Sequence, residues 1–283
     1  MGSSAPLTAP DRIRRILVAL DASPHSLSAL QAAVELAADL SAELVGVFVE
    51  DVNLVRMAAL PVTREIGQTS ARIRDIDERT LTRQLRGLAL RAERALAREA
   101  GRMQVRWSFT VSRGTVGSEL WGAAAETDLV VMGRAGWSPS RKAGSSVEAV
   151  LAFGMRRTLV IEAGARLQPS LLVVYDGSEM ADRALQTALM LTKSKGGYLA
   201  VAIARPDPEQ AQRLQRVVAE QLQPHGLEVR YRWLLSSDAQ SLAELVASEP
   251  GSVLVVPAEA PQLQERSLPE VLEAFNCPVL IVR

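Results

Sequence analysis

Residues 16–31 read ILVALDASPHSLSALQ, and residues 171–186 read LLVVYDGSEMADRALQ. When the two stretches are aligned, their Asp-x-Ser motifs coincide, with Asp21 opposite Asp176. Each stretch begins with an aliphatic run, continues through the motif and ends with apolar residues spaced three and four apart. That order predicts a buried strand, a tight turn and an amphipathic helix. The chain therefore contains the same strand–turn–helix unit twice.

The ends of the two halves match as well. AVLAFGMRRTLVI (149–161) parallels EVLEAFNCPVLIV (270–282), and DLVVM (128–132) parallels SVLVV (252–256). Self-similarity of this length predicts tandem copies of one domain.

Aliphatic runs alternate with helical patterns throughout both copies. We expect strands at 16–20, 44–49, 105–111, 129–132 and 158–162, and again at 171–175, 198–203, 228–235, 252–256 and 279–282, with a long helix over 71–100. Such alternation is typical of a parallel, doubly wound α/β sheet with right-handed crossovers. We therefore predict two tandem five-stranded, Rossmann-like sheets with helices on both faces. They should occupy residues 13–163 and 170–283, after a flexible tail at 1–12.

The bulk properties bear on location and partners. Lys and Arg total 32 and Asp and Glu total 32, so the net charge gives no overall field to attract nucleic acid or an anionic membrane. The single cysteine, Cys277, excludes an intrachain disulfide and is interpreted as a buried structural thiol. No apolar run is long enough to span a bilayer. We expect a cytoplasmic protein without a nucleic-acid or membrane partner.

Asp21 and Ser23 follow the first predicted strand and allow two interpretations. They can cap the next helix by accepting hydrogen bonds from free backbone N–H groups. Alternatively, the Asp21 carboxylate can accept from a ribose hydroxyl or an adenine amino group, since ligands of such sheets bind beyond the carboxyl ends of the strands. The recurrence of the motif at Asp176 fits both.

The loop GRAGWSPSRKAGSS (133–146) follows the strand DLVVM and also allows two interpretations. Glycines let a backbone approach an anion, and the amides of a helix start favour negative charge. The same residues, however, mark any tight strand-to-helix connection. The loop matches neither a Walker P-loop nor the compact Gly-x-Gly-x-x-Gly of dinucleotide folds.

Together these features resemble the universal stress protein family in its tandem two-domain form. The resemblance rests on VALDAS (18–23), VVYDGS (173–178) and CPVLIV (277–282). It implies a five-stranded parallel α/β fold, a role in stress response and, in one branch, binding of ATP through Gly-x-x-Gly, nine residues, and Gly-Ser/Thr.

The resemblance also implies a nucleotide site in the first domain. Asp21 would contact the adenosine, the Val49 backbone would contact adenine, and Gly133 and Gly136 would approach the ribose and phosphates. The full implied set is Asp21, Ala22, Ser23, Val49, Met132, Gly133, Arg134, Gly136, Gly144, Ser145 and Ser146.

Two departures from the family pattern weigh against binding. Seven residues, not nine, separate Gly136 from Gly144. The second copy has no glycine over 257–271, and it places Glu259 and Glu265 where phosphates would lie. Missing close approach and charge repulsion both oppose ATP there, so we expect the second domain not to bind it.

The expected function is therefore a stress-response binding module with an adenine-nucleotide site in the first domain, ATP being the candidate ligand, accompanied by Mg. The alternative is a structural or adaptor protein that acts through protein contacts. No catalytic residues and no protein metal site are predicted, so any ATP hydrolysis would be slow and incidental. The resemblance further implies a pseudo-dimer of the two domains through 158–162 and 279–282. A homodimer of whole chains and the identity of protein partners stay open.

Overall fold

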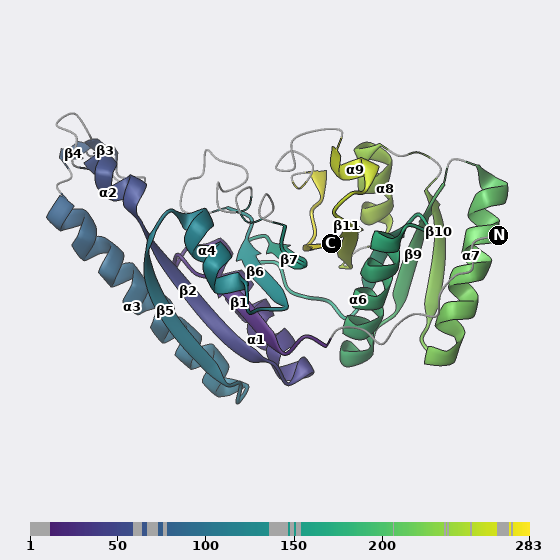
Figure 1. The fold of residues 1–283 in the computed structure, drawn as a ribbon, viewed down its shortest axis with the longest axis horizontal. Helices are drawn as coiled ribbons and strands as arrows, with labels where there is room; N and C mark the ends of the chain where they lie inside the picture. The colour runs from purple at the N-terminus through teal and green to yellow at the C-terminus, as the bar shows by residue number, and fades with distance from the viewer. Residues whose placement is uncertain are drawn as a thin grey trace.

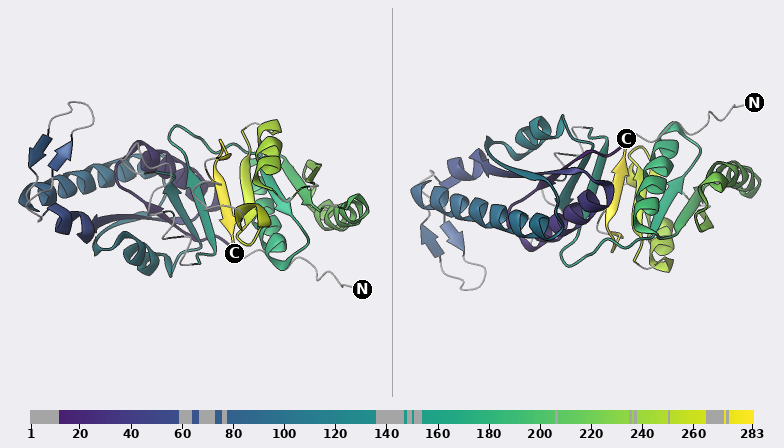
Figure 2. Two further views of the ribbon diagram at one scale, coloured as in Figure 1. Left: turned by 90° about the horizontal axis from the view of Figure 1, so that it is seen from above. Right: turned by 90° about the horizontal axis from the view of Figure 1, so that it is seen from below.

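The computed structural model describes residues 12–58, 64–66, 73–75, 78–135, 147, 150, 154–205, 207–234, 236, 238–249, 251–264, 272 and 274–283. These residues form a ten-stranded sheet, in the order β10-β9-β8-β11-β12-β7-β6-β1-β2-β5, with helices on both faces (Figures 1 and 2). The α/β fold predicted from the sequence is confirmed.

The two halves of the sheet have the same strand order. The strands of the first half are β1 (Arg15–Ala19), β2 (Glu43–Asp51), β5 (Trp107–Gly114), β6 (Leu129–Gly133) and β7 (Arg157–Ile161). Those of the second half are β8 (Leu171–Tyr175), β9 (Leu199–Ala204), β10 (Val229–Leu234), β11 (Val253–Pro257) and β12 (Val279–Val282). Within each half all pairings are parallel, and β8, β9, β10, β11 and β12 correspond to β1, β2, β5, β6 and β7.

One pairing joins the two halves and is antiparallel. Strand β12 lies against β7, with Leu280 opposite Leu159 and Val279 opposite Val160. This pairing joins the two segments, 158–162 and 279–282, that the family resemblance names for the pseudo-dimer, and it makes the two five-stranded sheets a single sheet. Both strands are aliphatic and would otherwise be open edges, which is the arrangement that favours strand-to-strand association.

The helices divide between the two faces. The first half contains α1 (Pro24–Leu40), α2 (Val52–Ala58), α3 (Glu78–Arg102) and α4 (Val116–Ala124), and the second contains α6 (Glu179–Lys195), α7 (Pro208–Leu222), α8 (Ala239–Ser248) and α9 (Pro261–Gln264), with a short 3-10 helix at Gln223–His225. One core cluster contains buried residues of α1, α3, α6 and α7, and the other contains those of α4, α8 and α9. Ile16 and Val18 of β1 belong to the first cluster and Leu17 to the second, as the period of a strand requires.

The helix expected over 71–100 begins later than predicted. Residues Ile73–Asp75 form strand β4, which pairs antiparallel with β3 (Arg64–Ile66) as a separate two-stranded sheet. The helical spacing of apolar residues cannot reveal a pairing with a segment outside the window, so the sequence pattern favoured helix there. None of the described helices has the length and hydropathy needed to cross a membrane.

Cys277 lies just before β12 and is buried, as its apolar sequence context predicted. Burial raises the pKa of its thiol to about 11, so the thiol is neutral at physiological pH. A neutral, enclosed thiol is a poor nucleophile, which agrees with a structural role.

Replacing Leu280 with alanine should destabilise the whole chain, because this side chain is 1% exposed within the core cluster that both halves share. We expect Leu280→Ala to lower the free energy of unfolding by about 2–5 kcal/mol in urea denaturation. Leu90→Ala, at a leucine that is 52% exposed, is the matched control and should change it by less than about 0.5 kcal/mol. Equal effects of the two substitutions would contradict the role of the shared core.

Candidate functional site

The carboxyl ends of β1, β2 and β6 meet at one edge of the sheet in the first half. Strand β1 lies between β2 and β6, so the chain leaves β1 at the point where the strand order reverses. In parallel α/β sheets this is where ligands bind. Helix α1 begins at the same place, directly after Asp21, Ala22 and Ser23.

The turn after β1 is held by its own side chains. The Ser23 amide donates to Asp21 Oδ1 at 2.9 Å, and the Ser26 amide donates to Ser23 Oγ at 3.2 Å. Ser23 is completely buried and is the N-cap of α1. The capping interpretation of the sequence is thus confirmed, with Asp21 forming an Asx turn. The contact of Asp21 with an adenosine stays a prediction.

Ala22 has an uncommon backbone conformation for its residue type. Its φ is 60°, in the left-handed region, whereas the matching residue of the second half is Gly177, with φ 81°. A left-handed residue with a Cβ atom is strained by about 1 kcal/mol. The Ala22 methyl group therefore strains the backbone of the first turn. Gly177, which has no side chain, avoids this strain in the second.

The N–H and C=O groups of Val49 point past the end of strand β1, and the contact of Val49 with adenine stays a prediction. The Val47 carbonyl accepts a hydrogen bond from the Leu20 amide at 2.9 Å, so Val47 faces β1. Alternate residues of a strand face the same neighbour, and the N–H and C=O groups of Val49 consequently point to the same side. Because β1 ends at Ala19, they point beyond its end. A neighbouring donor and acceptor are what the edge of an adenine ring requires.

Gly133 ends β6 in close contact with the first turn of α1. A Cβ atom at this position would lie 2.8 Å from His25 Cβ and 2.9 Å from the Ser26 amide nitrogen. Packing alone therefore requires a glycine here, with or without a ligand. The preceding residue, Met132, is 2% exposed, and its side chain belongs to the core below the sheet edge. Any ligand contact of Met132 must come from its backbone.

The Arg134 side chain lies in a contact with the second half, and a nucleotide contact of Arg134 stays a prediction. Its side chain is only 4% exposed, and Nη2 donates to the carbonyl oxygens of Phe275 at 2.7 Å and Cys277 at 3.3 Å. Its Nη1 lies 3.4 Å from a carboxylate oxygen of Glu162, and its backbone amide donates to Ile161. The sequence shows that Arg134 is positively charged. It does not show that the carbonyl groups of the second half accept its hydrogen bonds. Arg134 ties β6 to the second half.

The phosphate end of the predicted site cannot be followed in the structure. Gly136, Gly144, Ser145 and Ser146 lie outside the described residues, and so does Glu265. Glu259 is described and is exposed just beyond β11.

The second half has the same turn at Asp176, but a different residue contacts it. The Ser178 amide donates to Asp176 Oδ1 at 2.9 Å, and Ser178 caps α6. Arg205, the counterpart of Glu50 in the aligned strands, donates from its guanidinium to the Asp176 carbonyl oxygen. The sequence comparison had not singled out this arginine, although its position next to the Val49 counterpart, Ala204, could have revealed it.

The two turns give a stability test with opposite signs. Ala22→Gly removes the strain of a left-handed alanine and should raise the free energy of unfolding by up to about 1 kcal/mol. Gly177→Ala introduces that strain and brings a methyl group 3.0 Å from Leu214 Cδ1, so it should lower stability by at least about 1 kcal/mol. Thermal or urea unfolding of both variants would measure this. A shift in the same direction for both would contradict the assignment.

Comparison with known proteins agrees with this architecture. The model of the universal stress protein family matches residues 12–152, which contain the candidate site. The solved structure of a universal stress protein from Archaeoglobus fulgidus is 17% identical, with a TM-score of 0.73, covering 98% of this chain and 97% of that one. A functionally unknown protein from Pseudomonas aeruginosa is 15% identical, with a TM-score of 0.57, covering 95% and 92%. No curated protein matches this sequence. At such identities the solved structures show likeness of fold alone, and the family is shown by the match over residues 12–152: the chain belongs to the universal stress protein family.

Proposed function

We propose that the protein is a stress-response binding module whose first half binds ATP or a related adenine nucleotide at the carboxyl ends of β1, β2 and β6. The observation that carries the proposal is the direction of the Val49 backbone, whose N–H and C=O point beyond the end of β1. Membership of the universal stress protein family supports it.

Each part of the nucleotide has a proposed partner. The Val49 backbone pairs with the adenine edge, and the Asp21 carboxylate, fixed by the Ser23 amide, accepts from a ribose hydroxyl. The loop over 133–146 supplies the phosphate contacts. Mg²⁺ is proposed only as the ion that the ATP phosphates carry, since within the described residues no group of three or more His, Cys, Asp or Glu side chains could hold a metal.

We propose that the chain consists of two tandem domains, 13–163 and 170–283, and that the second does not bind nucleotide. In the second half the Arg205 guanidinium donates to the carbonyl oxygen of Asp176, in the turn that corresponds to the Asp21 turn of the first half. The segment 257–271 has no glycine that would let a backbone approach phosphate.

An adaptor function without nucleotide is the alternative. It is favoured by Arg134, whose charge is withdrawn from the site into the contact with Phe275 and Cys277. A weaker positive field at the loop makes phosphate binding depend more on the backbone. Titration with nucleotide separates the two functions.

Calorimetric titration of ATP and AMP into the full chain tests the proposal. We expect one site per chain, with Asp21→Asn weakening binding about tenfold or more, because a hydrogen bond to a charged acceptor contributes about 1.5–3 kcal/mol. Asparagine retains the side-chain oxygen that accepts from the Ser23 amide, so the turn should persist. AMP binding as tight as that of ATP would mean that the loop makes no net contact with the terminal phosphates.

Asp176→Asn is the matched control, since it makes the same change in the same turn of the second half. It should leave the ATP affinity unchanged. Gly133→Ala is unsuitable as a binding variant, because its methyl group would collide with the first turn of α1 whether or not nucleotide binds. No heat of binding at millimolar ATP, together with no thermal shift, would overturn the nucleotide proposal and favour the adaptor function.

A further inference from the structure

Helix α3 carries an unusual concentration of positive charge. It contains seven arginines and three glutamates over Glu78–Arg102, and no lysine or aromatic residue. Figure 1 shows the helix along the outer margin of the first half, beyond the edge strand β5. Five of its arginines form what we call the arginine face, namely Arg79, Arg83, Arg86, Arg91 and Arg94, and all five are exposed.

The apolar side of α3 is already used by the fold. Leu85, Ala89, Ala92 and Leu96 are buried in the core cluster that lies on the sheet. Only Leu90, at 52% exposure, interrupts the arginine face with a large apolar side chain. The helix therefore presents charge, and almost no apolar surface, to a partner.

Among the residues that the structure describes, no acidic side chain pairs with the arginine face. Farther along the helix, Glu99 pairs with Arg98 at 2.9 Å and with Arg102 at 3.4 Å. Within the part of the chain that the structure describes, no comparable ion pair or side-chain hydrogen bond involves the arginine face. Acidic residues three or four positions away would have stabilised the helix by pairing with this charge.

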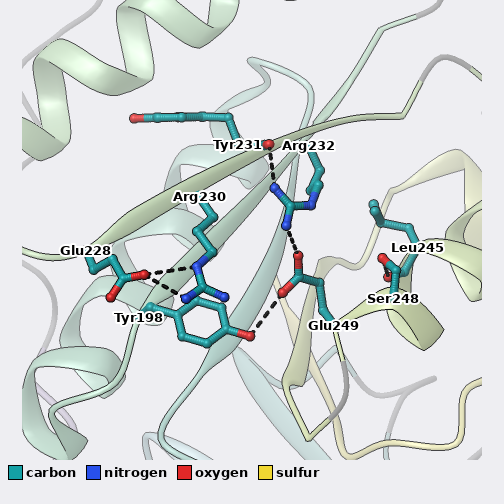
Figure 3. Close-up of polar contacts among 8 residues, drawn as sticks. All are labelled: Tyr198, Glu228, Arg230, Tyr231, Arg232, Leu245, Ser248 and Glu249. Carbon is teal, nitrogen blue, oxygen red and sulfur yellow. Dashed lines mark hydrogen bonds and ion pairs between the residues drawn. The ribbon is translucent and has the colours of Figure 1, made fainter.

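Strand β10 shows the opposite use of arginine (Figure 3). Arg232 lies 2.5 Å from the buried Glu249 carboxylate, which also accepts from the Tyr198 hydroxyl at 3.0 Å. Arg230 bonds to Glu228 at 2.7 Å and stacks on the Tyr198 ring at 3.9 Å. These guanidinium groups are occupied by the fold itself. Those of the arginine face are available to an external anion.

The geometry of the arginine face suits a grooved polyanion. From Arg79 to Arg94 it extends about 22 Å along the helix, at about 1.5 Å per residue. Around the helix the five positions span an arc of about 140°, at about 100° per residue. A flat anionic surface can contact only the arginines on a narrow part of this arc. A groove with charged walls on both sides can contact all five arginines.

We propose that the arginine face of α3 binds double-stranded DNA through its phosphates. The major groove of B-form DNA is about 12 Å wide and accepts a helix, whose diameter is about 10–12 Å. The major groove of A-form RNA is too deep and narrow for this. Arginine also matches phosphate geometry with two parallel N–H donors.

An anionic membrane is the competing partner, and the burial of α3 opposes it. Helices that bind membranes insert an apolar face between the lipids, whereas the apolar face of α3 is occupied by Leu85, Ala89, Ala92 and Leu96 packing on the sheet. The net charge of zero does not oppose DNA binding, because charges beyond about 10 Å are largely screened at 0.1 M salt. The absence of aromatic residues from α3 removes the stacking that single strands need.

The test is fluorescence anisotropy with the full chain and a labelled DNA duplex of about 20 base pairs, two helical turns. Phosphate-directed binding predicts micromolar or weaker affinity at physiological salt, and a fall of log K with log salt of slope about −4.5 for five contacts. Arg83→Gln/Arg94→Gln should reduce that slope by about 2 and weaken binding at least tenfold at about 50 mM salt. Circular dichroism and thermal unfolding would establish that the fold is retained.

The matched control is Arg213→Gln/Arg216→Gln, which removes the same charge from exposed arginines of α7 in the second half. It should leave the DNA affinity and its salt slope unchanged. Equal loss in both variants, or no DNA binding at about 50 mM salt, would overturn the proposal. Binding to vesicles of equal parts phosphatidylserine and phosphatidylcholine, but not to DNA, would overturn it in favour of the membrane. The proposal is independent of the nucleotide site, so ATP binding by both variants should match that of the unsubstituted protein.

Discussion

Strand β7 of the first half and β12 of the second pair in antiparallel register, and the rest of the structure depends on this contact. Each half would otherwise end in an open aliphatic edge. Their pairing satisfies the backbone groups of both strands and closes one core around Leu159 and Leu280. Arg134 and Arg157 add hydrogen bonds across the same junction, the second to Thr187 of α6 at 3.1 Å. The two halves are consequently one body held by one continuous sheet.

The candidate site depends on that junction through the first turn of α1. This turn packs against Gly133 so closely that no side chain fits. It also holds the segment that leaves β7, since the Ala163 amide donates to His25 Nδ1 at 3.1 Å and the Gly164 amide donates to Ser28 Oγ at 2.9 Å. The helix start that positions the Asp21 turn is thus fixed from two sides. A binding turn held in this way needs little reordering when a ligand arrives.

The two halves retain the same strands and differ where the strands end. Tight packing restricts change within the core, whereas the loops at the carboxyl ends can change without loss of the fold. Glu50 in one half corresponds to Arg205 in the other, and Gly133 corresponds to Pro257. The surfaces differ too, since the described residues provide no ion pair for the arginine face of α3, whereas both arginines of β10 are paired. The two halves therefore share one fold but expose different charged and polar groups.

The sequence by itself determined the α/β class and the ten strands of the main sheet, and it offered capping by Asp21 and Ser23 as one of two interpretations. These follow from local patterns, namely aliphatic runs, helical spacing and a capping motif, which act within a few residues along the chain. The residues of the adenosine end could be named from family resemblance. The direction of the Val49 backbone could not, because it depends on the length of β1 relative to β2.

Only the tertiary structure decided the role of the Arg134 side chain, the late start of α3 and the antiparallel register in which the two sheets join. Each depends on a partner distant in sequence: the carbonyl groups of Phe275 and Cys277, the backbone of Arg64–Ile66, and strand β12. The arginine face is of the same kind, since the total composition balances the charges and only the packing of α3 on the sheet shows which side of the helix is exposed. The net charge adds all charges of the chain together. In the folded protein the arginines of α3 are concentrated on one surface, because the opposite side of the helix packs on the sheet.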